Sequence, residues 1–171
     1  TGLRGGETPG KLFGGPMTMK ESLDTFEMIT TWGTEGRREF RPSKDATCVE
    51  RLSNEGAILM GKTNTPEFTL SFKTDNLIFG QTNNPFDTSR TPGGSSGGAA
   101  AIISAGGSPF DVGTDTGGSI RLPSHFCGIS GIKPTTGRAP CTGNALPTQS
   151  HTHHRRWRRH TTPQPYLADL A

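Results

Sequence analysis

The chain has 171 residues, of which 29% are hydrophobic, 24 are glycine and 13 are proline. This apolar content is low for a packed domain, yet the pattern is not that of a disordered chain. We therefore expect a loop-rich active-site region of a larger fold. No apolar run approaches the roughly 18 residues of a membrane-spanning helix, which excludes such a segment in this sequence. The net charge of +3 comes from residues 151–171, whereas residues 1–150 are balanced and give no indication of nucleic-acid binding.

Three short elements are predicted in the first third of the chain. Residues 14–22, GGPMTMKES, alternate methionine with threonine, which predicts a strand. Residues 45–56 predict a helix that begins at Asp45 as its N-cap and ends at Gly56. The run AILMG at 57–61 is wholly apolar and predicts a strand buried on both faces. A helix followed by a buried strand is half of a parallel unit, which indicates an α/β fold.

A long loop is predicted from residue 64 to residue 98, where asparagine, proline and glycine recur. We expect four phenylalanines to anchor it: Phe68, Phe72, Phe79 and Phe86. Beyond the loop, residues 99–107 favour a helix, residues 109–113 a short strand, and residues 127–132 a strand-like stretch.

Two segments rich in glycine and serine carry most of the functional information: GGSSGG at 93–98 and GTDTGGSIR at 113–121. Each places hydroxyl groups among residues that leave the backbone free to turn sharply and to point its N–H groups at a ligand. A hydroxyl nucleophile beside free amide donors is what acyl transfer requires, because the amides stabilise the oxyanion.

Three other interpretations of these segments compete with acyl transfer by a serine–lysine pair. A phosphate-binding P-loop requires a closing Gly-Lys-Ser/Thr, which is absent. The motif GSSGG matches the nucleophile elbow of α/β-hydrolases and would make Ser96 the nucleophile. However, no strand is predicted before it, and His125 in a proline-flanked loop is better explained as a structural residue. The segments could also be simple turns, but two dense loops framed by Asp115 and Arg121 argue against this.

The serine–lysine interpretation needs a lysine that burial keeps neutral, because only the neutral amine can accept a proton. Lys20 suits this role, since it ends an apolar strand-like run. Lys62 and Lys133 are alternatives by composition alone. The three cysteines are odd in number and lack CxxC spacing, which favours a reducing compartment over a disulfide framework or a zinc site: Cys48, Cys127 and Cys141.

Four long segments occur together and in a characteristic order: GGPMTMKES, DATCVERLSNEGAILMGKTNTPEF, FGQTNNPFDTSRTPGGSSGGAAA and VGTDTGGSIRLPSHFCGISGIKPTTGR. On these segments the chain resembles the amidase signature family from about residue 11 to residue 147. The resemblance implies a mixed β-sheet between helical layers, of which this chain would hold a part that is incomplete at both ends. Residues 1–147 would form a partial catalytic domain, and residues 148–171 a basic tail rich in histidine and arginine.

The resemblance also implies a Ser–Ser–Lys triad that uses no metal and no cofactor. Lys20 would be the base, Ser95 the bridging serine behind a cis peptide bond, and Ser119 the nucleophile. Lys62 would fall at a scaffold position. The oxyanion would be bound by four backbone N–H groups: those of Thr116, Gly117, Gly118 and Ser119. The supporting residues would be Ser96, Asp115 and Arg121. The acyl-binding region would include Thr69 and Leu70.

The implied activity is hydrolysis of a small-molecule carboxylic amide through an acyl-enzyme, in the cytoplasm, with no membrane segment in this chain. One alternative is the A subunit of an amidotransferase, which releases ammonia from glutamine for a partner. Another is a truncated fragment without activity. A homodimer of the full protein is left open. Nucleic-acid or metal binding by the tail is disfavoured, because Trp157 among four arginines matches no recognised module.

Overall fold

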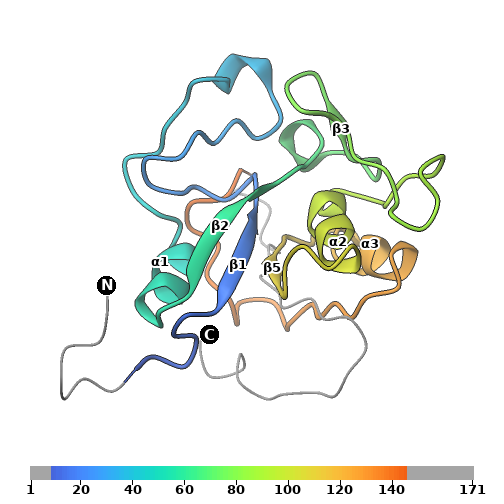
Figure 1. Cartoon of the computed structure of the whole chain (residues 1–171). Helices are drawn as coiled ribbons and strands as arrows, with labels where there is room; N and C mark the ends of the chain where they lie inside the picture. Colours follow the sequence, from blue (N-terminus) through green and yellow to red (C-terminus); the bar gives the residue numbers. More distant parts are fainter. Residues whose placement is uncertain (1–8, 146–171) are drawn as a thin grey trace.

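The computed structural model describes residues 9–145 of the chain. Its centre is a three-stranded parallel sheet in the order β2–β1–β5 (Figure 1). The strands are β1 (Pro16–Lys20), β2 (Ile58–Thr63) and β5 (Asp111–Val112). The helices are α1 (Thr47–Asn54), α2 (Gly97–Ser104) and α3 (Arg121–Phe126). Helix α1 lies on one side of the sheet and α2 on the other, which confirms the α/β class (Figure 1).

The two faces of β1 differ in chemistry, as its alternating sequence predicts. Met17 and Met19 are fully buried in the apolar core, where they meet Val49 and Leu52 of α1. Burying an apolar side chain of this size stabilises the fold by about 1.5–3 kcal/mol. The other face of β1 is turned toward α2 and carries Lys20 at the carboxyl end of the strand.

A β-bulge in β2 determines which of its residues reach which face. The register passes from Met17↔Leu59 to Thr18↔Gly61, so that Met60 is the extra residue. After the bulge, Thr63 pairs with Lys20 and lies on the same face of the sheet. A slip of one residue would exchange the two faces, so the bulge is what brings Thr63 to the polar side.

The prediction that β2 is buried on both faces is wrong for the described residues. Ile58 and Met60 are 51% and 67% exposed, because β2 is the edge strand of this sheet and no described element covers its outer side. The helix before it also begins differently from the prediction. Ala46 is the N-cap of α1, and Asp45 Oδ1 instead accepts a hydrogen bond from the N–H of Phe26 at 2.6 Å. Gly56 ends the helix as expected, with a φ of 85°.

The long loop is anchored by polar side chains, so the prediction of aromatic anchors is wrong. All four of its phenylalanines are exposed: Phe68, Phe72, Phe79 and Phe86. Asn76 instead donates hydrogen bonds to Asn64 Oδ1 and to the carbonyl of Thr65, both at 2.7 Å. Buried Thr74 donates to the carbonyl of Gly93 at 2.8 Å. Loop backbone requires such partners when it is buried, and aromatic rings cannot supply them. The loop also contains η2 (Glu67–Thr69) and the hairpin β3 (Asp75–Asn76) and β4 (Gly80–Gln81).

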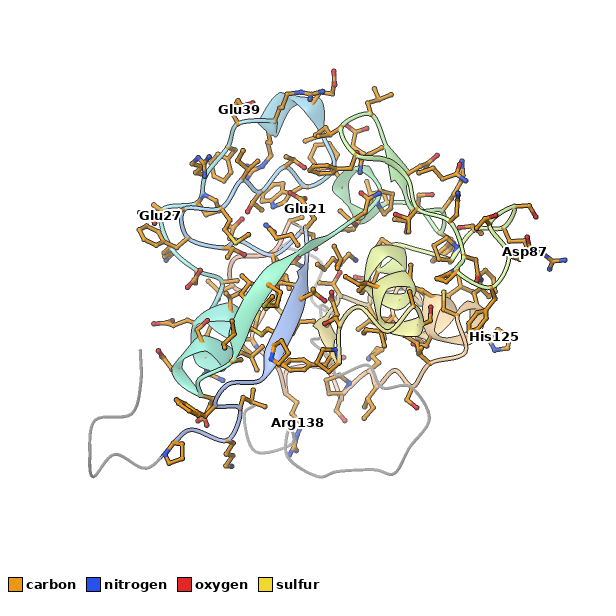
Figure 2. The ribbon with its side chains drawn as sticks, viewed as in Figure 1. Glu21, Glu27, Glu39, Asp87, His125 and Arg138 are labelled. Atoms are coloured by element: carbon orange, nitrogen blue, oxygen red, sulfur yellow. The ribbon has the colours of Figure 1, made fainter. Side chains whose placement is uncertain are left out.

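Further along the chain, two of the predicted elements form and one does not. Helix α2 begins two residues earlier than expected, and β5 lies within the predicted range 109–113. No described strand occupies residues 127–132. Helix α3 was not predicted. It contains His125 in its last turn with an exposed side chain (Figure 2), so the placement of this histidine in a loop as a structural residue is wrong. The remaining short helix is η1 (Glu35–Arg37).

Candidate active site

The amine of Lys20 lies at the centre of a buried cluster of hydroxyl groups. Lys20 is fully buried, and its Nζ donates hydrogen bonds to Ser95 Oγ and Thr114 Oγ1, both at 2.7 Å. Burial lowers the pKa of Lys20 to about 7, although the carboxylates of Asp111 and Asp115 act in the opposite direction. A substantial fraction of this amine is therefore neutral at neutral pH and able to accept a proton.

Ser95 follows the cis Gly94–Ser95 peptide bond, as the resemblance implies. Its side chain is 1% exposed, and its carbonyl accepts a hydrogen bond from Thr65 Oγ1 at 3.0 Å. The backbone of the long loop packs directly against this turn, since a Cβ added at Gly94 would lie 2.7 Å from the carbonyl oxygen of Ser71. Glycine is thus required here for close approach of two backbones.

Ser96 joins the two glycine–serine segments to each other; we call residues 93–98 the first serine loop and residues 113–121 the second serine loop. Its Oγ donates to the carbonyl of Thr114 at 3.2 Å and accepts from the N–H of Thr114 at 3.3 Å, while its own N–H donates to the carbonyl of Ser119 at 3.1 Å. Ser96 is fully buried at the start of α2, and no strand precedes it. This placement fits a supporting residue and not a nucleophile elbow.

The pairing of Asp115 with Arg121 forms as expected and braces the second loop. Asp115 is fully buried and accepts hydrogen bonds from Arg121 Nε at 3.1 Å and Nη2 at 2.9 Å. It also accepts from the backbone N–H groups of Gly118, Ile120 and Arg121. Burial alone would raise the pKa of Asp115, but these hydrogen bonds outweigh it and lower the pKa to about 2. The carboxylate therefore stays charged and holds the loop in its tight turn.

Ser119 lies within this turn with an exposed fraction of 8%. The hydroxyl of Ser119 forms no hydrogen bond with any residue from 9 to 145. Among these residues, Ser119 is linked to the first serine loop only through its carbonyl, which accepts from the N–H of Ser96. The N–H groups of Thr116, Gly117 and Ser119 have no acceptor within the same range. The N–H of Gly118 differs from the expectation, because it donates to Asp115 Oδ1 at 2.9 Å. Three of the four expected amides are therefore unoccupied beside the serine.

The segment expected to line an acyl group lies next to this loop. Thr69 is half-buried and Leu70 is 69% exposed, and their N–H groups donate to the carbonyls of Pro66 and Glu67. Phe72, which the motifs did not single out for the site, comes closer. Its ring lies 3.9 Å from the place where a Cβ of Gly117 would be. An apolar ring therefore stands beside the free amides.

The other two lysines considered from the sequence lie outside the cluster around Lys20. Lys62 pairs with Met19 in the sheet, so its side chain is on the opposite face from Lys20. Its Nζ donates to the carbonyl of Leu23 at 3.0 Å. Burial lowers the pKa of Lys62 to about 8, and the charges of Glu21 and Asp24 oppose this effect. Lys133 donates to the carbonyl of Pro134 at 3.1 Å. The basic tail lies outside the described residues.

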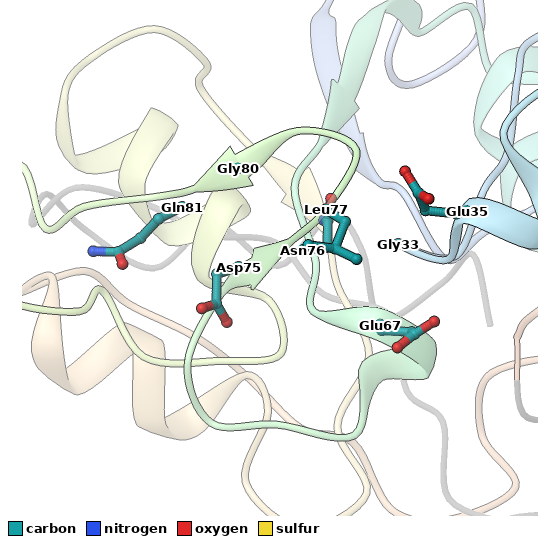
Figure 3. A pocket seen from close by; sticks show the side chains of 8 residues that line it. All are labelled: Gly33, Glu35, Glu67, Asp75, Asn76, Leu77, Gly80 and Gln81. Atoms are coloured by element: carbon teal, nitrogen blue, oxygen red, sulfur yellow. The ribbon is translucent and has the colours of Figure 1, made fainter.

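A surface pocket separate from the residues expected in the site lies between the β3–β4 hairpin and the segments of η1 and η2 (Figure 3). Among its lining residues are three acids, Glu35, Glu67 and Asp75. Two of them are paired, Glu35 with Arg38 and Asp75 with Lys73. The pocket contains none of the residues expected in the site. Across the described range, no three metal-binding side chains gather as a metal site would require, and no helix is long and apolar enough to cross a membrane.

A buried amine bonded to a serine hydroxyl, with free amides on an adjacent loop, is the arrangement of a serine-type hydrolase. The comparisons with known proteins agree with this class. The family model described as Amidase matches residues 2–155. The A subunit of the glutamyl-tRNA(Gln) amidotransferase of Rhodopirellula baltica is 52% identical over 135 residues, which are 79% of this chain and 27% of that protein.

Solved structures give the same result. The peptide amidase of Stenotrophomonas maltophilia matches with a TM-score of 0.82 and 34% identity, over 88% of this chain and 32% of its own. A fatty acid amide hydrolase matches with a TM-score of 0.85 and 32% identity, over 91% of this chain and 28% of its own. The chain belongs to the amidase signature family of hydrolases. It spans about a quarter to a third of the length of the relatives that it matches.

Proposed function

We propose that the protein containing this chain hydrolyses a carboxylic amide of a small molecule through an acyl-enzyme on Ser119. The observation that carries the proposal is the 2.7 Å contact between Lys20 Nζ and Ser95 Oγ inside a fully buried cluster. A lysine with a pKa near 7 is about half neutral at pH 7, and in this form it can act as a general base.

In the first step, neutral Lys20 accepts the proton of the Ser95 hydroxyl while Ser95 accepts the proton of Ser119. The Ser119 oxygen then forms a bond to the amide carbonyl carbon, and the carbonyl π bond becomes an oxyanion. This step requires the Ser119 hydroxyl to turn toward Ser95. The backbone hydrogen bond from Ser96 to the carbonyl of Ser119 joins the two loops at this point.

The oxyanion would be received by backbone N–H groups of the second loop. Those of Thr116, Gly117 and Ser119 have no acceptor within residues 9–145, whereas that of Gly118 is held by Asp115. One donor of this kind typically contributes about 2.7–4 kcal/mol of transition-state stabilisation. We therefore assign the oxyanion to the three unoccupied amides.

The second half of the reaction returns the proton along the same path. Ser95 passes a proton to the leaving nitrogen and recovers one from Lys20, and the carbon–nitrogen bond breaks to release the amine. Water then gives a proton to the relay, and its oxygen forms a bond to the ester carbonyl carbon. The bond from this carbon to Ser119 Oγ breaks, the carboxylic acid leaves, and the relay returns its proton to Ser119. Phe72 beside Gly117, with Thr69 and Leu70 in the same segment, would contact the acyl group.

A second candidate is the glutaminase activity of an amidotransferase. It is favoured by the identity of about half of the aligned residues with the protein of this kind from Rhodopirellula baltica. The same triad would then release ammonia from glutamine. Ammonia release that depends on tRNA and on a partner protein would identify this activity, whereas hydrolysis of simple amides by the chain alone would identify a general amidase.

The proposal is tested with a fluorophosphonate probe, which forms a covalent bond with an activated serine. Mass spectrometry of the labelled chain should locate the adduct on Ser119, and Ser119→Ala should remove both the adduct and amide hydrolysis. Ser96→Ala tests the nucleophile elbow, because it removes the hydroxyl that would react there; it should weaken labelling through the lost bonds to Thr114 but leave the adduct on Ser119. Labelling that depends on Ser96 instead would support a nucleophile elbow, and no labelling of the wild-type chain would support an inactive fragment.

A further inference from the structure

A buried carboxylate lies beside Lys20 that none of the sequence motifs singled out. Asp111 of β5 is fully buried, and its Oδ2 accepts a hydrogen bond from Thr63 Oγ1 of β2 at 3.0 Å. Because β1 lies between β2 and β5, this bond has to cross one face of β1. Asp111 pairs with Thr18 in the sheet and Thr63 pairs with Lys20, so the crossing lies on the face that carries Lys20.

The charge of Asp111 is poorly balanced by hydrogen bonds. Its Oδ1 is buried and has no hydrogen-bond partner among the described residues. Burial raises the pKa of Asp111 to about 6, while the hydroxyls of Thr18 and Thr63 and the charge of Lys20 act to lower it. Asp115 is different, because five hydrogen bonds already satisfy its two oxygens. Asp111 is therefore the carboxylate with the larger effect on the amine, and Asp115 has a smaller effect in the same direction.

Few other charges face this amine. Helix α2, which covers the same face of the sheet, contains no titratable residue. Strand β2 contributes Thr63 on this side, and its charged residue, Lys62, is on the other face. The second serine loop contributes Asp115, which is paired with Arg121. The protonation of Lys20 is thus governed by burial on one side and, on the other, by Asp111 first and Asp115 second.

We propose that Asp111, held across β1 by Thr63, is a positioning residue that sets the pH at which Lys20 becomes available as a base. The inference rests on the proposed role of Lys20 in amide hydrolysis. A negative charge beside the amine favours its protonated form, which opposes burial. Without this charge the ammonium form would be lost at a lower pH, and the neutral amine would be a weaker base for Ser95.

The test is an NMR titration of the chain labelled with ¹³Cε-lysine, in which Lys20→Arg identifies the Lys20 resonance by its disappearance. Asp111→Asn keeps the size of the side chain and an acceptor for Thr63. It should lower the pKa of Lys20 by about one unit or more, the usual effect of an opposite charge at close range. An unchanged or raised pKa of Lys20 in this variant would overturn the proposal.

Two further variants keep the test decisive. Thr63→Val removes the hydrogen bond that favours the charged form of Asp111, so the pKa of Lys20 should fall by a smaller amount even if Asp111→Asn does not fold. Glu21→Gln is the matched control, because Glu21 is buried next to Lys20 in the sequence but acts on Lys62. It should lower the pKa of Lys62 and leave the pKa of Lys20 unchanged. If Glu21→Gln lowered the pKa of Lys20 as much as Asp111→Asn does, a specific role of Asp111 would be contradicted.

The activity readout separates this inference from the proposed function. In the protein that forms the acyl-enzyme, Asp111→Asn should move the acid limb of the pH profile of kcat/KM to lower pH, in parallel with the pKa of Lys20 measured by NMR. If the wild-type protein hydrolyses amides but Asp111→Asn changes neither the pKa of Lys20 by NMR nor the acid limb of the pH profile, the role of Asp111 is wrong and the proposed function stands. If the NMR titration moves but the wild-type protein forms no acyl-enzyme, the proposed function is wrong, and with it the catalytic part of this inference.

Discussion

The two faces of the central sheet are built from the same three strands but on different physical principles. One face is mainly apolar, and its residues Met17, Met19 and Val112 pack against α1. The other face carries Lys20, Thr63 and Asp111 beneath α2, with every polar group buried. The first face gains free energy by removing hydrocarbon from water. The second loses free energy by removing charges from water, and hydrogen bonds recover part of it.

The comparison shows how a site that costs free energy to bury is held within a fold that is stable. Successive side chains of a strand point to opposite faces, so each residue of β1 that forms the site is flanked by one that forms the core. Lys20 follows Met19, so the backbone that carries Lys20 is anchored by a buried side chain that has no part in the chemistry. We expect the two faces to respond in opposite ways to substitution.

Lys20→Met is the change with the largest expected effect. The loss of the base should lower amide hydrolysis by about 10⁴-fold or more, as measured by steady-state kinetics of the protein. The same change should remove part of the pH dependence of stability. The pKa of Lys20 is about 7 in the folded chain and 10.5 in the unfolded chain, so the unfolded state binds more protons between these values. The free energy of unfolding should therefore rise with pH across this window.

In Lys20→Met, the part of this rise that begins near pH 7 should disappear. The part due to Lys62, which begins near pH 8, should remain. Urea denaturation at several pH values between 6.5 and 10 measures both. A rise of unchanged size in Lys20→Met would show that the amine is not buried in the folded chain.

Met19→Ala is expected to have the next largest effect, on stability. Met19 is fully buried in the apolar cluster, and truncating a methionine in such a place typically costs about 2–5 kcal/mol. The free energy of unfolding should fall by this amount at every pH, because no titrating group is removed. A pH-dependent loss would mean that Met19 acts through Lys20 and not through packing.

Arg121→Gln should have a smaller effect, because Arg121 is 55% exposed and three of the five hydrogen bonds to Asp115 come from backbone N–H groups. We expect a loss of about 1–2 kcal/mol at neutral pH. The low pKa of Asp115 contributes stability above pH 3.8 that is lost as the pH falls toward 2. Acid unfolding should therefore be less steep in Arg121→Gln than in the wild type. Equal steepness would assign the low pKa to the backbone donors alone.

The sequence predicted those parts of the molecule that depend on short-range pattern or on long motifs. The alternation before Lys20 predicted β1 and its two faces, and the resemblance carried by the long motifs implied the contact of Lys20 with Ser95. Thr114 and Asp111 could not be predicted as neighbours of Lys20, since their positions depend on strand order and on the register of β5 against β1. A lone threonine or aspartate carries no motif of its own.

Helix α3 was missed for a different reason. Pro123 and the glycines around the helix indicate a loop by composition. However, Pro123 lies in the first turn, where its missing N–H would have had no partner within the helix. The anchors of the long loop were also misassigned, because the spacing of aromatic residues suggests packing but says nothing about which groups satisfy the buried backbone.

Met60→Lys is expected to have the smallest effect and sharpens the contrast between covered and open parts of the sheet. Met60 is the extra residue of the bulge and is 67% exposed, so a lysine there should change the free energy of unfolding by no more than about 0.5 kcal/mol. Leu59 is the matched control, because it is its neighbour and packs against the apolar core. Leu59→Lys should be strongly destabilising, since it would place a charge against Met17. Comparable losses for both variants would show that the outer side of β2 is covered in the folded protein, and would restore the sequence prediction of a strand buried on both faces.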